Sequence, residues 1–148
     1  LTILSEGKNN QRFRLLRMKM LVSVIRPWIK TLDDCGILTI QAVMPTQKHK
    51  EATDAIMSEL KRISADGVTE MELTKAKIFY HNQLLEKLNN VLEMGMFYAL
   101  SYYFNLEEKS PEDILAKIKD LSLDKINDLA KTIFKPEAFS HLTLGPAF

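Results

Sequence analysis

Residues 59–77 read ELKRISADGVTEMELTKAK, and this stretch carries the signals that decide the fold. Its first half continues an apolar repeat at helical spacing and ends at Gly67, where glycine suits the left-handed backbone that closes a helix. Thr69 and Glu72 then form a capping box, in which the threonine covers an amide of the first turn and the glutamate reaches back. The stretch therefore predicts two consecutive helices joined by a tight turn.

Three elements are predicted before this pair of helices. The apolar spacing favours a helix near residues 10–20, whose arginines mostly face solvent. Residues 21–28 and 37–44 are rich in branched side chains and flank a turn, so they predict an antiparallel hairpin. Thr46 is then placed to cap the next helix. The second strand has one fully apolar face, typical of a sheet that helices cover on one side, made by Leu38, Ile40, Ala42 and Met44.

Further elements follow the capping box. The long helix is expected to break or bend at Gly95, and residues 96–104 are apolar nearly all round, which predicts burial. Ser110 and Ser122 each stand where a further helix begins. Residues 139–144 alternate in polarity as a strand does. Because the strands are grouped apart from the helices, the sequence indicates an α+β fold, with an antiparallel sheet packed against several helices.

Composition limits the class of protein. With 148 residues, of which 46% are apolar and 26% charged, residues 1–148 are expected to form a single domain or part of one. The net charge of +1 gives no reason to expect a nucleic acid as partner, and no apolar run reaches the roughly 20 residues of a membrane span. Charge is nevertheless uneven, because the first thirty residues contain seven basic groups and one acid.

Candidate chemistry is sparse. His49, His81 and His141 lie on separate predicted elements, and no His-x-x-Glu-His motif occurs, so the sequence predicts no metal site in this chain and reads the histidines as surface or packing residues. Cys35 stands in a turn without an identifiable base. A basic cluster could hold carboxylates, carbonyls or phosphates, although a solvated helix face is the favoured interpretation; it comprises Arg12, Arg14, Arg17 and Lys19.

The decisive stretch resembles the pitrilysin/insulinase-type zinc peptidases, which include bacterial processing proteases and mitochondrial processing peptidase. The resemblance rests on GVTEMELTKAK at 67–77, on the strand that opens at Gly36, and on residues 15–23 as a helix leading into a strand. Such proteins are built from two similar α+β halves around a chamber. The resemblance implies that this chain is the later part of the second, inactive half, a fragment whose sheet has an exposed edge.

The same resemblance implies roles for partners and residues. One half of such a protein supplies His-x-x-Glu-His and zinc, so zinc is expected in an upstream domain or partner subunit. The other half supplies an Arg and a Tyr that hold peptide substrate. Arg17 matches that arginine by its place after Leu16, with Arg14 as a rival, whereas Ser23 and Val24 stand where the tyrosine is expected.

Two functions follow from the resemblance. The first is a non-catalytic segment of a metallopeptidase-like protein that helps to enclose or position a peptide, with Arg17 as its substrate-binding residue. The alternative is a degenerate structural or assembly subunit that no longer handles peptide, which the missing tyrosine would permit. A bacterial periplasmic or envelope location would fit if a signal peptide lies upstream.

Overall fold

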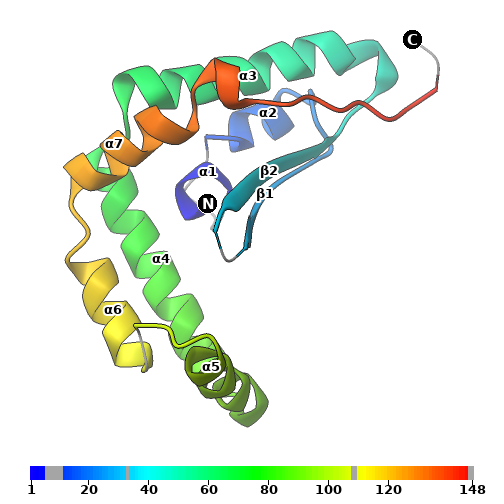
Figure 1. Cartoon of the computed structure of the whole chain (residues 1–148). Helices are drawn as coiled ribbons and strands as arrows, with labels where there is room; N and C mark the ends of the chain where they lie inside the picture. The colour runs from blue at the N-terminus through cyan, green and yellow to red at the C-terminus, as the bar shows by residue number, and fades with distance from the viewer. Residues whose placement is uncertain (6–11, 33, 108–109, 147–148) are drawn as a thin grey trace.

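The computed structural model describes residues 1–5, 12–32, 34–107 and 110–146 (Figure 1). Two short helices precede a β-hairpin, and five helices follow it. In chain order the elements are α1 (Thr2–Ser5), α2 (Arg14–Met18), β1 (Val24–Thr31), β2 (Gly36–Val43), the 3-10 turn η1 (Thr46–Lys48), α3 (His49–Asp66), α4 (Glu70–Leu88), α5 (Val91–Tyr103), α6 (Pro111–Lys119), α7 (Leu123–Ile133) and the 3-10 turn η2 (Pro136–Ala138). Within the described ranges no helix has the length and apolar character needed to cross a bilayer.

The predicted hairpin is present. Strands β1 and β2 pair antiparallel from Val24 opposite Val43 to Thr31 opposite Gly36. Alternate residues of β1 are buried at its start, because one face of the hairpin packs on the helices and the other meets solvent. All four residues predicted for the apolar face of the second strand pack against the core: Leu38, Ile40, Ala42 and Met44. This confirms the α+β fold class, with helices against one face of an antiparallel sheet.

The core lies between the hairpin, α2, α3 and α7 (Figure 1). Phe13, directly before α2, is fully buried, and α3 contributes an inward stripe at helical spacing. The α3 stripe consists of Ala52, Leu60 and Ile63. Helix α7 closes this core with Ala130 and with Phe134, the residue directly after the helix.

The junction between α3 and α4 forms as residues 59–77 predict. Gly67 ends α3 with a φ of 73°, and the Thr69–Glu72 capping box opens α4. A Cβ on Gly67 would lie 2.7 Å from the Asn127 Oδ1, the same atom that accepts a hydrogen bond from the Val68 amide at 2.8 Å. Only glycine fits here, because both the backbone conformation and the approach of α7 exclude a side chain.

Arg12 joins the same junction and departs from the expected outward direction of the arginines. Its side chain is 8% exposed and donates to the Glu72 carboxylate at 2.7 and 2.8 Å and to the Gly67 carbonyl at 3.0 Å. Its Nη1 also lies 3.5 Å from the Glu59 Oε1. Burial raises the pKa of Glu72, but the hydrogen bonds from Arg12 and from the Thr69 amide outweigh it and hold that pKa below its usual value. Arg12 therefore ties the N-terminal segment to α3 and α4.

Several predicted boundaries were wrong. Residues 10 and 11 of the first predicted helix lie outside the described residues, and over residues 12–20 the helix is regular only in α2. Thr46 does not cap α3: it begins η1, and α3 starts at His49 without a side-chain cap. The long helix breaks at Asn90, whose side-chain oxygen accepts from the amides of Leu92 and Glu93, so Gly95 lies inside α5. Asparagine at an N-cap satisfies free amides that glycine cannot.

The predicted burial of residues 96–104 was also wrong. Ser101 is the single buried residue of α5, whereas Val91 and Tyr103 are more than 80% exposed. Helix α5 lies at the end of α4 farthest from α3 (Figure 1), so the core of this chain does not reach it. An apolar helix in water has a strong tendency to acquire a partner.

Residues 139–144 form no strand, contrary to the prediction. Phe139 packs against the core, but Leu142 and Leu144 are more than 90% exposed. The segment is extended and runs past α3 toward the start of that helix (Figure 1). Alternation gave the right local backbone, yet a strand also needs a neighbour, and no described strand pairs with this one.

Candidate functional site

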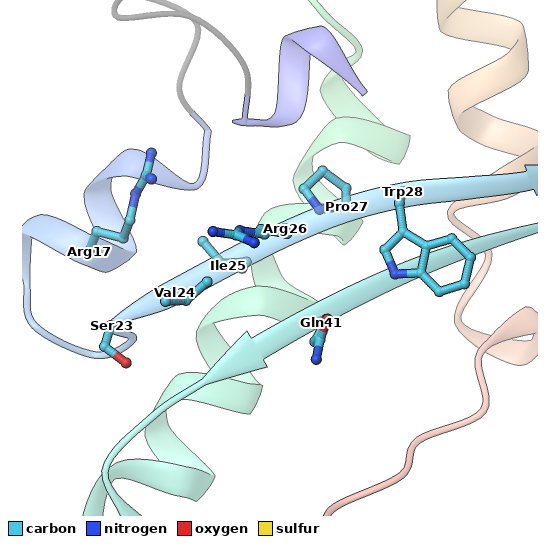
Figure 2. A pocket seen from close by; sticks show the side chains of 8 residues that line it. All are labelled: Arg17, Ser23, Val24, Ile25, Arg26, Pro27, Trp28 and Gln41. Carbon is cyan, nitrogen blue, oxygen red and sulfur yellow. The ribbon is translucent and has the colours of Figure 1, made fainter.

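An open pocket of about 610 Å³ lies where α2, the turn after it and the start of β1 meet (Figure 2). We call it the Arg17 pocket. Its lining residues are Arg17, Ser23, Val24, Ile25, Arg26, Pro27, Trp28 and Gln41. The lining combines two guanidinium groups with an indole and an amide and includes no acidic side chain.

The turn after α2 sets the place of Arg17. The Met20 amide donates to the Arg17 carbonyl at 2.9 Å and the Leu21 amide donates to the Leu16 carbonyl at 3.0 Å, which is the paired bond pattern of a Schellman ending. Met20 has a φ of 53° in the left-handed position that glycine usually occupies. Leu16 and Leu21 are both buried, so α2 is fixed on its inner side and presents Arg17 to solvent.

Strand β1 supplies the second guanidinium. Val24, Arg26 and Trp28 alternate on the exposed face of the strand, because Ile25 and Pro27 between them are buried. Gln41 stands opposite Arg26 in the antiparallel register. Figure 2 shows the Arg26 side chain lying along β1 toward α2, the helix from which Arg17 projects. Across the described ranges of the chain, neither Arg17 nor Arg26 has an ion-pair partner.

Ser23 occupies one of the two positions where the family resemblance expects a tyrosine. Its hydroxyl donates to the Val43 carbonyl at 3.0 Å, so its proton is already used. Its oxygen can still accept a hydrogen bond, but in this arrangement it cannot donate one to a developing oxyanion. Val24, at the other position, has no polar side-chain atom. Neither position therefore supplies the hydroxyl donor that the resemblance expects of a tyrosine.

The structure brings together some predicted residues and separates others. Arg17, Ser23 and Val24 line one pocket, whereas Arg14 is exposed on α2 and does not line it. The sequence reasoning missed Arg26, Trp28 and Gln41. The alternation of β1 already placed two of them on one exposed face, but the register that sets Gln41 opposite Arg26 becomes visible only in the folded hairpin.

The histidines are also closer than the sequence indicated. His49 and His141 stack with their ring centroids 6.0 Å apart, and a ring nitrogen of His49 lies 3.0 Å from the Thr143 hydroxyl. Residues 1–5, 12–32, 34–107 and 110–146 nevertheless contain no group of three or more His, Cys, Asp or Glu side chains that could hold a metal. Because zinc in proteins takes three or four ligands, this pair does not fit a zinc centre.

Comparison with known proteins identifies the family of this chain. The sequence profile of the peptidase M16 inactive domain matches residues 1–80, which include every residue of the Arg17 pocket. The chain belongs to this family. It is the family that residues 59–77 resemble. No curated protein matches the chain.

Solved structures show the same fold for this M16 domain. The inactive peptidase domain of a proposed zinc protease from Bordetella parapertussis superposes with a TM-score of 0.76 at 14% identity, covering 93% of this chain and 75% of that one. A proposed zinc protease from Bordetella pertussis Tohama I gives 0.73 at 14% identity, with 93% and 76% covered. A protease from Helicobacter pylori gives 0.74 at 22% identity, with 88% and 32% covered. At these identities the similarity shows the fold alone.

Proposed function

We propose that this M16 inactive domain is the later part of the second half of a two-half peptidase, and that its Arg17 pocket positions peptide for a zinc-bearing half. The observation that carries the proposal is the pocket itself, with two guanidinium groups that have no ion-pair partner in the described residues and no acid in the lining. The profile match supports it, because the matched range contains this pocket. Peptide is the proposed ligand, and the zinc-bearing half is the proposed partner.

The chemistry expected of the pocket is orientation. A guanidinium offers a planar fork of donors that suits carboxylate oxygens and can also reach a peptide carbonyl. Gln41 adds an amide that can donate and accept, and the rim of Trp28 adds apolar area for a side chain of the peptide. Holding the peptide in one register raises the rate of a reaction that another half performs, because orientation entropy is lost on binding.

Cleavage assays on the separate and assembled halves test this division of labour. The purified chain, supplied with zinc and a library of peptides, is expected to cleave nothing. Addition of the zinc-bearing half should give cleavage that exceeds the activity of that half alone. Peptide cleavage by the isolated chain, at a rate that a chelator abolishes, would refute the proposal.

A second candidate is an assembly subunit that no longer handles peptide. The exposed apolar surface of α5 favours it, because Val91, Leu92, Tyr102 and Tyr103 are each more than 65% exposed. Large apolar side chains exposed in such numbers are typical of interfaces with other proteins. The Ser23 hydroxyl agrees with this role, because it donates to the Val43 carbonyl and so is no donor for a ligand in the pocket.

Variants on the two surfaces separate the candidates. If the chain only assembles, Arg17→Ala should leave peptide binding and the activity of the complex unchanged, whereas Tyr103→Lys should weaken assembly. If the chain positions peptide, Arg17→Ala should weaken peptide binding while the complex still forms. Copurification and peptide affinity, measured on both variants, give the answer.

A further inference from the structure

We propose that the Arg17 pocket is a carboxylate site: Arg17 and Arg26 together select peptides that present an acidic group. This inference rests on the proposed function and deepens it, because it names the chemical class of peptide. Arg26 is the new residue of the site, since the family resemblance expects one arginine, on α2, and assigns no role to position 26.

The lining of the pocket is positively charged. Two permanently charged guanidinium groups border one concave surface, and the other lining residues are neutral. Some basic groups of the described chain do have acidic partners, since Arg62 lies 2.8 Å from Glu59 and Lys117 lies 2.7 Å from Glu107, whereas Arg17 and Arg26 have none there. An anion bound in the pocket would be attracted by both guanidinium groups.

The hairpin places several hydrogen-bond donors at neighbouring positions of the pocket. Arg26 and Gln41 face each other across the hairpin, and Trp28 follows Arg26 on the same face. The site therefore offers guanidinium donors, an amide donor and an aromatic ring at neighbouring positions (Figure 2). A carboxylate accepts hydrogen bonds only, so it matches a site rich in donors better than a neutral amide of the same shape does.

Trp28 provides a direct readout. It is the only tryptophan in the chain, it lines the pocket, and the residue is 43% exposed. Its fluorescence therefore reports on ligands at this site without a label. Three N-acetylated peptides that lack tryptophan serve as probes. The first has a central Glu and an amidated C-terminus, the second has Gln in place of Glu, and the third is the Gln peptide with a free C-terminal carboxylate.

The expected result is a preference for the carboxylate. At low ionic strength the Glu peptide or the free-acid peptide should change the Trp28 fluorescence with an affinity about fivefold tighter than the Gln amide, and added salt should reduce the difference. Whichever of the two peptides is preferred identifies the source as a side chain or a chain terminus. Equal affinities for all three peptides, or no response to any of them, would overturn the inference.

Matched variants locate the effect in the pocket. Arg17→Gln and Arg26→Gln should each abolish the preference, whereas Arg14→Gln, which removes the same charge from the exposed side of α2, should retain it. Arg26→Lys keeps the charge without the planar fork and should retain only part of it. All four residue changes are at exposed positions, and melting curves verify the fold. A preference that survives both Arg17→Gln and Arg26→Gln contradicts the proposal.

Failure of this inference and failure of the proposed function give different results. Peptides that bind without regard to charge, in a manner that Arg17→Gln weakens, would remove the carboxylate site and leave peptide positioning intact. A carboxylate preference in the isolated chain, combined with unchanged cleavage by the assembled Arg17→Gln complex, would keep the site and remove the positioning role.

Discussion

Arg12 and Arg17 are five residues apart in sequence, carry the same charge and have opposite surroundings. Arg12 is 8% exposed and has every part of its guanidinium directed at oxygen atoms of Glu59, Gly67 and Glu72. Arg17 is exposed, borders an open pocket and has no ion-pair partner in the described part of the chain. One arginine holds the fold together, and the other is available to a ligand.

The difference between the two arginines follows from their surroundings: the Arg12 guanidinium contacts protein oxygen atoms, and the Arg17 guanidinium contacts solvent. A buried guanidinium is tolerated only when its donors are satisfied, so Arg12 can serve no ligand without loss of the α3–α4 junction. An exposed guanidinium is stable in water without a protein partner, so Arg17 can take up a ligand without a cost to the fold. Arginine composition alone could not distinguish these two roles.

Loss of Arg12 should have the largest effect on stability. Arg12→Met removes the hydrogen bonds to Glu72 and Gly67 and leaves the Glu72 carboxylate partly buried without its partner. We expect the free energy of unfolding to fall by about 3 kcal/mol. Chemical denaturation measures it, with Arg17→Met as the matched control, for which the change should be within about 0.5 kcal/mol. Similar losses of stability in the two variants would contradict the difference in role between Arg12 and Arg17.

Gly67→Ala should be the next most damaging change at the junction. The alanine backbone would have to keep a left-handed φ, and its new Cβ would displace the Asn127 side chain. Asn127 would then lose its hydrogen bond from the Val68 amide. The expected loss is about 2 kcal/mol. Gly95→Ala is the control, because it lies inside α5 with nothing within 4 Å of its Cβ, and it should gain up to about 1 kcal/mol. Thermal unfolding of both variants measures the two changes in stability. A change of the same sign in both variants would contradict this expectation.

Acid should weaken the Arg12 junction. The folded pKa of Glu72 lies below its unfolded value of about 4.3, so its contribution is complete above that pH and disappears as the pH falls through the folded pKa. Because Glu72 is partly exposed, we expect a contribution of about 1 kcal/mol or less. Unfolding measured between about pH 6 and pH 3 should show a shallower dependence in Glu72→Gln. An unchanged slope would remove Glu72 from this account.

Met20→Gly should have the smallest effect and should sharpen the description of the Arg17 side. Glycine relieves the left-handed strain at φ 53° that ends α2, with a gain of about 0.5 kcal/mol. Met18→Gly, inside α2, should instead cost about 1 kcal/mol. Differential scanning calorimetry on the pair distinguishes them. A destabilised Met20→Gly would mean that the methionine side chain, not the turn, determines where Arg17 lies.

Local signals in the sequence predicted the parts of the fold that depend on neighbours along the chain. The Thr69–Glu72 box, the Gly67 turn, the caps at Ser110 and Ser122 and the hairpin are all present. Each depends on groups within a few residues of one another, or on an alternation that one strand can display alone. The apolar face of the second strand was correct for the same reason.

Long-range partners were what the sequence could not supply. The apolar composition of α5 predicted burial, but burial needs a surface to pack on, and α5 lies beyond the core of this chain. Residues 139–144 had the alternation of a strand without a strand beside them. Arg12 and Glu72 are 60 positions apart, and Arg26 meets Gln41 only through the hairpin register, so neither pair is visible in a linear pattern.

The most direct test of the central claim is steady-state cleavage by the chain assembled with the zinc-bearing half, comparing Arg17→Gln with Arg14→Gln. We expect Arg17→Gln to raise KM about fivefold with an unchanged melting temperature, and Arg14→Gln to alter neither. Equal KM values for Arg17→Gln and the unaltered chain would contradict the claim that this exposed arginine positions the peptide.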